Sequence, residues 1–357
     1  MKPKVSVVIS VYNVKPFLPD CIESLLNQTL DPIELIFVDD CSTDGSWDVL
    51  QEYHAKYPDR MRVLRSPENV RQGGARNIGI KNAAADYIGF VDSDDAVLPE
   101  MYEKLYKAAT TSNADAAFCQ HSSVTEDFHL GGGGQCSFER HDPWSDQQKN
   151  LNNKMLSDED RTFLYANSLG GVVSGLWKKS IIVDNDCYFP ERTLWEDNYW
   201  GIFITPLLNK ICLVDEVLYL YRQRSGSTVH RVSPQSISQR IASEKKAVRR
   251  AKELGILERY YDALEYIYIF RYAINTSVLI LSVYGRTDHA YKMIRDIADD
   301  LEKTFPHWKK NAFYLKDRSP KEKLKTRLFL FHTNMFFHLQ KIYQTVKYLF
   351  VDRPVSQ

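Results

Sequence analysis

The strongest constraint on the fold is an alternation, over the first third of the chain, between short β-branched or aromatic runs and amphipathic stretches of helical period. This alternation is typical of βαβ units, in which helices join parallel strands and cover the sheet. The expected fold class is therefore α/β, with a mixed, mainly parallel sheet flanked by helices. Strands are expected at residues 5–10, 33–38, 61–65, 87–91 and 114–119.

The pattern changes twice further along the chain. Between residues 121 and 153 the periodicity fails, and glycines, Asp and Gln dominate. We interpret this segment as a long loop or insertion over the site that helps to receive a partner molecule; an idle variable insertion is the alternative. Order returns between residues 157 and 224, where residues 172–177, 199–208 and 217–221 read as strand, helix and strand. After Pro234 the chain reads as helical. We therefore expect two domains, residues 1–230 and a helical region at residues 231–357.

Charge is balanced overall but not locally. The 46 Lys and Arg equal the 46 Asp and Glu, so no global field attracts nucleic acid, and no nucleic-acid partner is expected. Residues 321–350, however, interleave cations with Phe, Leu, Ile and Tyr. This segment could lie on an anionic bilayer as a peripheral membrane contact, or dock on the preceding helices. A nucleic-acid patch is a third hypothesis, for which no binding motif is visible.

Targeting signals are weak. The apolar run at residues 5–9 is too short for a signal peptide, and residues 328–339 are interrupted by polar side chains, so no transmembrane helix is expected. The six cysteines lie far apart, without the spacing of a zinc site. A cytoplasmic protein, which could be peripheral on the inner face of the cell membrane, is expected.

Two predicted strands end in carboxylates. The strand at residues 33–38 runs into Asp39 and Asp40, and the strand at residues 87–91 runs into the sequence Asp92-Ser93-Asp94-Asp95. Because the carboxyl ends of parallel strands meet at one edge, these groups should lie together. Such carboxylates repel one another unless a cation intervenes, and Mg²⁺ or Mn²⁺ bridging a diphosphate is the natural inference. Helix capping is the alternative interpretation for the first pair.

A glycine-containing turn at residues 69–79 leads into a predicted helix that carries Arg71 and Arg76. Backbone N–H groups at a helix start and guanidinium groups both suit a diphosphate. The segment matches neither a Walker loop nor a dinucleotide fingerprint. An ordinary turn is the alternative.

Together these ordered motifs, with the sequence Trp195-Glu196-Asp197 downstream, resemble a family 2 glycosyltransferase of the GT-A (Rossmann-like) fold over the first 230 residues. The resemblance implies that Ser10, Tyr12 and Asp40 hold the nucleotide base and ribose. It also implies contacts of Asp92 and Asp94 with the ribose and diphosphate, and a divalent metal, Mn²⁺ or Mg²⁺, near Asp94 and Asp95.

The same resemblance assigns Asp197 as the catalytic base, which would take the proton of the acceptor hydroxyl as it attacks the anomeric carbon. A helix cap near Asn198 is the other interpretation of Asp197. Downstream, Arg222 or Arg224 could close on the diphosphate, although a solvated strand end would look the same.

The expected function is an inverting, metal-dependent glycosyltransferase that moves a sugar from a nucleoside diphosphate sugar, expected to be a UDP-sugar, to a saccharide or lipid-linked acceptor. By family resemblance, cell-surface polysaccharide synthesis is the setting, and residues 121–153 lie on the acceptor side. A non-catalytic nucleotide-sugar-binding or membrane-adaptor protein of the same fold is the alternative. A nucleotidyltransferase would need a Gly-rich basic loop after the first strand, where Ser10 and Tyr12 stand instead.

Overall fold

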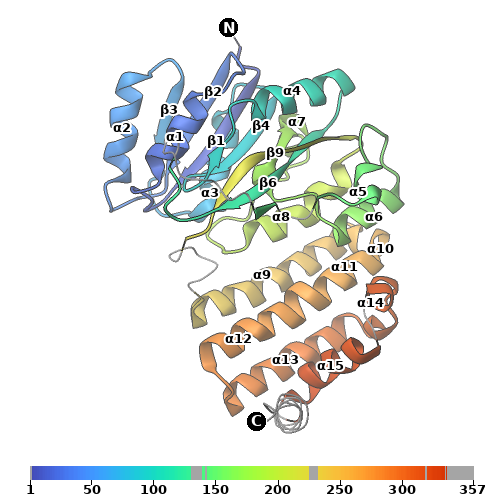
Figure 1. Ribbon diagram of the computed structural model, residues 1–357. Coiled ribbons are helices and arrows are strands. Elements are labelled where there is room, and N and C mark those ends of the chain that lie inside the picture. Colours follow the sequence, from blue (N-terminus) through green and yellow to red (C-terminus); the bar gives the residue numbers. More distant parts are fainter. Residues whose placement is uncertain are drawn as a thin grey trace, which may run out of the picture. The chain divides into compact units, whose positions relative to one another are not determined.

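The computed structural model describes residues 2–129, 139–140, 143–224, 232–317, 320–333 and 335. The chain divides into two compact units, Met1–Arg231 and Val232–Gln357 (Figure 1). The first unit is built around one sheet, and the described part of the second unit is helical.

The sheet of the first unit has the strand order β3-β2-β1-β4-β8-β6-β9-β5, with β7 paired to β6. Its first four strands are parallel to one another, whereas β8 is antiparallel to both of its neighbours. The fold class is therefore confirmed as a mixed sheet with helices on its faces and helices following it. The strands are β1 Val5–Val11, β2 Ile33–Asp39, β3 Met61–Arg65, β4 Tyr87–Asp92, β5 Ala96–Val97, β6 Ala116–Val124, β7 Glu139–Arg140, β8 Gly175–Lys178 and β9 Ile211–Arg222.

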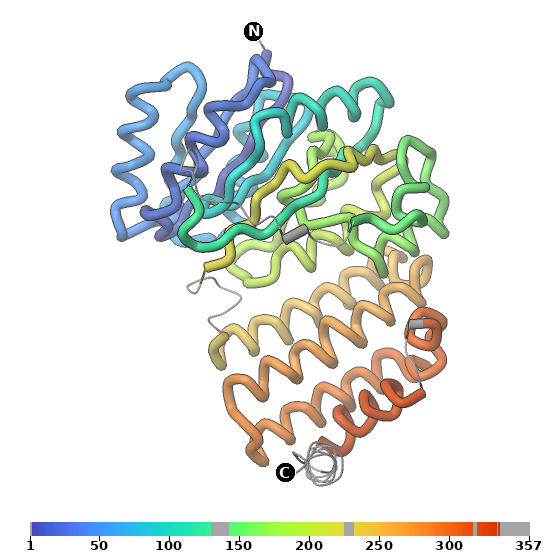
Figure 2. Tube along the Cα trace, viewed as in Figure 1, coloured from blue at the N-terminus to red at the C-terminus, as the bar shows by residue number. Residues whose placement is uncertain are grey.

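Helices cover both faces of this sheet, as the chain trace in Figure 2 shows. Successive residues of a strand point to opposite faces, so β1 sends Val7 and Ile9 to one apolar core and Val8 to the other. The first core contains side chains of α1 (Leu18–Leu26), α2 (Ser46–Lys56) and α4 (Met101–Ser112). The second contains side chains of α3 (Arg71–Asn82), α7 (Lys179–Val183) and α8 (Glu196–Ile204).

The predicted irregular segment at residues 121–153 is more ordered than expected. Strand β6 continues to Val124, because its polar residues Gln120 and Ser122 are buried in parallel pairing with β9. A short helix, α5 (Asp146–Lys149), begins at a capping box formed by Ser145 and Gln148. Residues 130–138 and 141–142 lie outside the described part of the chain.

The expected elements between residues 157 and 224 are shifted. The predicted strand at 172–177 is a 3₁₀ turn, η1 (Val172–Ser174), followed by β8, and the predicted helix at 199–208 starts earlier, as α8, and ends in η2 (Thr205–Leu207). Helix α6 (Asp158–Ala166) was not predicted, although Ser157 and Asp160 form a capping box at its start.

The second unit confirms the expected helical region. Its long helices α9 and α13 begin at the side-chain caps Ser233 and Thr287. The described helical segments are α9 Pro234–Glu253, α10 Ile256–Arg259, α11 Tyr261–Ile267, the π-helical η3 Tyr268–Asn275, α12 Thr276–Tyr284, α13 Asp288–Thr304, η4 Trp308–Lys310, α14 Ala312–Asp317 and α15 Pro320–Phe331.

One continuous helical stretch of this unit, Tyr261–Tyr284, is long and apolar enough to cross a membrane, with a mean hydropathy of 1.4. Of its most apolar window, 44% is buried within the protein. This is weak evidence for a membrane span, because the core helix of a soluble protein has the same length and composition. The five described cysteines are free, and Cys136 lies outside the described residues.

Helix α3 packs directly on β1 because Gly79 has no side chain. A Cβ atom built at Gly79 would lie 2.8 Å from Val8 Cγ2 and 3.0 Å from Val8 Cβ. We expect Gly79→Ala to lower the free energy of unfolding by about 1–3 kcal/mol through overpacking. Gly201→Ala in α8 is the matched control, because nothing lies within 4 Å of its Cβ position; it should stabilise by about 0.5–1 kcal/mol. Urea unfolding of both variants measures this, and equal effects would contradict it.

Candidate active site

Strand register brings the predicted carboxylates to one edge of the sheet. Val11 of β1 lies opposite Asp39 of β2, and Ser10 lies opposite Asp92 of β4. The strands are parallel, so all three end at the same edge, as expected from the sequence. Ser10 is buried at 9% exposure, whereas Tyr12, just beyond the strand, is 51% exposed.

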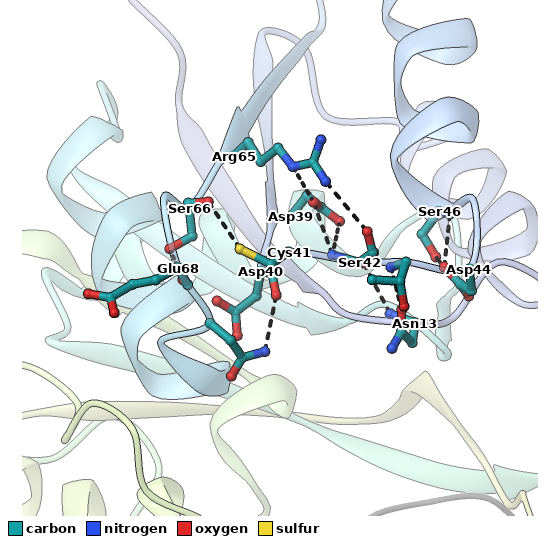
Figure 3. Close-up of polar contacts among 12 residues, drawn as sticks. Asn13, Asp39, Asp40, Cys41, Ser42, Asp44, Ser46, Arg65, Ser66 and Glu68 are labelled. Carbon is teal, nitrogen blue, oxygen red and sulfur yellow. Dashed lines mark hydrogen bonds and ion pairs between the residues drawn. The ribbon is translucent and has the colours of Figure 1, made fainter.

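At the end of β2, Asp39 and Asp40 point in different directions (Figure 3). Asp39 has no exposure; it accepts a hydrogen bond from the Ser42 N–H at 3.3 Å and forms an ion pair with Arg65 Nε at 3.2 Å. These partners fix the turn after β2. Asp39 therefore stabilises the turn, whereas the family resemblance assigns the nucleotide to Asp40 and not to Asp39.

Asp40 is held by the segment that precedes α3. Its Oδ1 accepts a hydrogen bond from the Val70 N–H at 2.7 Å, and its backbone carbonyl accepts one from Asn69 Nδ2 at 3.1 Å. Burial raises the pKa of Asp40, while the N–H groups of Val70 and Arg71 lower it. Arg71, which begins α3 with a φ of 61°, is thereby tied to Asp40. Asp40 and the glycine-containing turn are thus joined by hydrogen bonds.

The three aspartates after β4 have different surroundings. Asp95 is buried, and its two carboxylate oxygens accept hydrogen bonds from Tyr219 OH at 2.5 Å and from the Arg222 N–H at 2.7 Å. Burial, then the charges of Asp94 and Asp92, raise the pKa of Asp95 well above its usual range. Asp94 is 18% exposed at its side chain and pairs with Arg224 Nε. Of the two predicted metal ligands, Asp94 is the one that reaches the surface.

Arg222 and Arg224 are also unlike each other. The Arg222 side chain has no exposure, and it binds the Asp94 carbonyl at 2.8 Å, the Asp20 carboxylate at 3.0 Å and the carbonyls of Glu126 and Phe128. It therefore joins β9 to α1 and to the segments that follow β4 and β6. Its guanidinium is enclosed, and Nε, Nη1 and Nη2 each have a partner within the protein, so Arg222 is less available than Arg224 for the predicted diphosphate contact. Arg224 is 19% exposed.

Arg76 lies between the carboxylate of Asp92 at the end of β4 and that of Glu196 at the start of α8. Its guanidinium is 3% exposed and bonds to Asp92 Oδ1 at 2.8 Å and to Glu196 Oε1 at 2.9 Å. Gln72, one turn earlier on α3, donates to the same Asp92 oxygen at 2.5 Å. Gln72 was missed by the sequence analysis, although its i, i+4 spacing from Arg76 was visible.

The catalytic base expected from the sequence lies in the first turn of α8. Asp197 is exposed, and its negative charge adds to the rise in the pKa of Asp92, which burial mainly causes. Glu196 is buried; burial raises the pKa of Glu196 to about 7, with Arg76 opposing and Asp197 adding to the shift. Because α8 starts at Glu196, Asp197 is not its N-cap residue, but Asp197 Oδ1 accepts a hydrogen bond from the Asn198 N–H at 2.8 Å, so part of the capping interpretation holds. An exposed carboxylate beside a fixed, buried one can accept a proton from a bound hydroxyl.

A divalent cation would find few free oxygens here. Among the described residues, no three His, Cys, Asp or Glu side chains are arranged as a metal site. Asp94 fits such an ion best, because it is partly exposed and its present partner is a cation, Arg224. Both oxygens of Asp95 already accept hydrogen bonds from within the protein.

The sequence profile "Glycosyl transferase family 2" matches residues 6–169 of the chain. EpsJ of Bacillus subtilis (strain 168), an uncharacterized glycosyltransferase, is 31% identical over 230 residues, which are 64% of this chain and 63% of EpsJ. The chain thus spans less than two thirds of that relative. EpsH of the same organism is 30% identical over 267 residues, which are 74% of this chain and 73% of EpsH.

Among solved structures, Staphylococcus aureus TarS 1–349 in complex with UDP-GlcNAc superposes with a TM-score of 0.66 at 18% identity, over 91% of this chain and 86% of that one. At this identity the superposition supports the fold alone, and it agrees with the GT-A architecture expected from the strand-end motifs. Taken with the profile match and the length over which EpsH aligns, the ordered motifs at the sheet edge show that this chain belongs to glycosyltransferase family 2.

Proposed function

We propose that the protein is an inverting, metal-dependent glycosyltransferase that moves a sugar from a nucleoside diphosphate sugar to a saccharide or lipid-linked acceptor. One observation carries the proposal: Arg76 contacts both Asp92, at the donor edge of the sheet, and Glu196, the neighbour of Asp197. Donor-binding and proton-accepting groups therefore lie within one cluster.

The donor would lie along the carboxyl edge of the sheet. Asp40, Ser10 and Tyr12 would receive the base and ribose, as the resemblance implied. Asp92 would meet the ribose, and Arg71 and Arg224 would meet the diphosphate. A UDP donor is favoured by the TarS complex with UDP-GlcNAc, which has the same fold.

In the proposed reaction, Asp197 takes the proton of the acceptor hydroxyl while that oxygen attacks the anomeric carbon from the face opposite the diphosphate. The carbon–oxygen bond to the diphosphate breaks with inversion, and the leaving group carries the electron pair. Arg224 would neutralise charge on the departing diphosphate. When bound at Asp94, Mn²⁺ or Mg²⁺ would supply further positive charge to that leaving group.

The setting proposed is cell-surface polysaccharide synthesis on the cytoplasmic side of the membrane. One relative, 40% identical over 114 residues, is the poly(ribitol-phosphate) beta-glucosyltransferase of Bacillus spizizenii, and another is named for teichuronic acid biosynthesis. These names favour a polymer or lipid-linked acceptor. The acceptor side would include the segment at residues 121–153.

Replacing the proposed base should remove transfer but spare the donor site. For Asp197→Asn we expect kcat to fall by about 10²- to 10⁴-fold, with the KM for the donor nearly unchanged, because only proton transfer is lost. Asp184→Asn, an exposed aspartate just after α7, is the matched control and should keep full turnover. If Asp197→Asn transfers sugar as the wild type does, Asp197 is not the base. A wild type that binds nucleotide without any transfer would favour the non-catalytic binding protein.

Nucleotide binding can be tested without turnover. A thermal-shift screen with UDP, GDP, CMP and dTDP should show the largest rise in Tm with UDP and Mn²⁺, corresponding to about 2.7 kcal/mol at 100 times Kd. EDTA and Asp94→Ala should each remove the metal-dependent part. Asp86→Asn, at the opposite end of β4, is the control and should keep it. An equal UDP shift in EDTA would contradict a metal at Asp94.

The membrane contact expected at residues 321–350 is proposed for its described helix, α15; residue 334 and residues 336–350 lie outside the described part of the chain. Leu324 is 58% exposed, and the cations Lys321, Lys325 and Arg327 are exposed on the same helix. Such a surface should bind anionic lipid at about 1 kcal/mol per cation. Replacing these three cations by Gln should weaken binding to phosphatidylserine vesicles roughly 100-fold in a sedimentation assay.

The control for the vesicle assay is the triple Gln variant of Lys246, Arg249 and Lys252 on α9, which removes the same charge from exposed positions elsewhere. If both triple variants lose binding equally, net charge rather than α15 attracts the bilayer. If neither loses binding, α15 is not the contact.

A further inference from the structure

Arg76 bridges elements that lie far apart in the sequence. It belongs to α3, while Asp92 ends β4 and Glu196, 120 residues away, begins α8. Two different nitrogen atoms make the two contacts, Nη2 to Asp92 and Nη1 to Glu196. A forked guanidinium can span two carboxylates in this way, and a lysine ammonium cannot reproduce the geometry.

The Arg76 guanidinium also packs against two aromatic rings. Its central carbon lies 5.3 Å from the ring centre of Phe189 and 6.0 Å from that of Phe90. Phe189 in turn stacks on Trp200 of α8 at 4.7 Å. Because the Arg76 guanidinium pairs with two carboxylates and packs against two aromatic rings, the side chain has little freedom to turn toward a ligand.

The start of α8 lies at this contact. Trp195, which precedes Glu196, has a φ of 66°, in the left-handed region that a non-glycine residue adopts only at a cost. Helix α3 approaches closely at Gly73, where an added Cβ would lie 3.2 Å from Glu196 Cβ. The Arg76–Glu196 ion pair thus lies at a tight helix contact and holds a strained turn.

We propose that Arg76 is a positioning residue, rather than the nucleotide contact that its sequence motif suggested. By holding Asp92 and Glu196 at once, it sets where Asp197 stands relative to the donor. The inference rests on the proposed transfer reaction. It adds that the donor site and the base are aligned by one buried cation that touches neither substrate.

The test separates kcat from nucleotide affinity. Arg76→Lys and Glu196→Ala each break the bridge, and we expect each to lower kcat by about 100-fold, the loss that a displacement of about 1 Å can cause. The Kd for UDP, measured by calorimetry, should stay within about threefold. Because both variants remove the same link, the double variant should lose no more than either single one. Glu196→Gln, which keeps an oxygen acceptor for Arg76, should lose less than Glu196→Ala.

Arg161→Lys is the matched control for general loss of a buried arginine. Arg161 is 8% exposed and binds the Leu208 carbonyl at 2.9 Å, within the same unit but away from these carboxylates. The Arg161→Lys variant, once circular dichroism has verified that it is folded, should keep the kcat of the wild type. If Arg76→Lys weakens UDP binding by the same factor as kcat, Arg76 is a donor ligand and the inference is wrong. Additive losses in the double variant would also overturn it.

A measurement without turnover separates this inference from the proposed function. Arg76 lowers the pKa of Glu196, which burial raises to about 7, with Asp197 and Asp92 adding to that rise. In Arg76→Gln the ¹³C shift of the Glu196 carboxyl carbon should therefore titrate at a higher pH than in the wild type. An unchanged midpoint would overturn the bridge, whether or not any sugar is transferred. If the midpoint shifts but the wild type transfers no sugar, the proposed transfer reaction is refuted and the Arg76 bridge is not.

Discussion

The structure of the first unit depends on the compensation of negative charge gathered at one edge of a parallel sheet. Register aligns the ends of β1, β2 and β4, so Asp39, Asp40, Asp92, Asp94 and Asp95 lie along the same edge. Carboxylates at this density repel one another and lose solvation on burial, which is why burial raises the pKa of Asp40, Asp92 and Asp95. Folding is therefore possible only if other elements deliver hydrogen-bond donors and positive charge to this edge.

The positively charged donors come from other strands and helices, and the ion pairs hold these elements at the acidic edge. Arg65 comes from β3, Arg76 from α3 and Arg222 from β9, and each meets a different aspartate or its loop. A buried charge pair is costly to break, because removing one partner leaves the other uncompensated. The same contacts that neutralise the edge consequently fix β9 against α1 and α8 against α3. Electrostatic compensation and tertiary assembly are one and the same set of bonds in this unit.

The sequence predicted what depends on local pattern and missed what depends on distant partners. The five expected strands and the helices between them are present, because β-branched runs and helical periodicity are local signals. Strand β6 extends past its predicted end because β9, about a hundred residues later, buries its polar residues. Similarly, the sequence placed two arginines near the acidic edge, but burial alone distinguishes Arg222, enclosed by carbonyls and Asp20, from Arg224. No spacing rule connects Asp20 to Arg222.

The acidic edge divides into carboxylates that build the site and carboxylates that remain available for chemistry. In Asp39 and Asp95 each carboxylate oxygen already meets an N–H, O–H or guanidinium donor of the protein, and both residues are buried. Asp94 and Asp197 keep exposed surface. A buried carboxylate that is already bonded within the protein loses those bonds if it turns toward a ligand, whereas an exposed one exchanges water for a ligand at little cost. Adjacent acidic residues, identical in sequence type, thus acquire opposite roles from the number of donors that surround them.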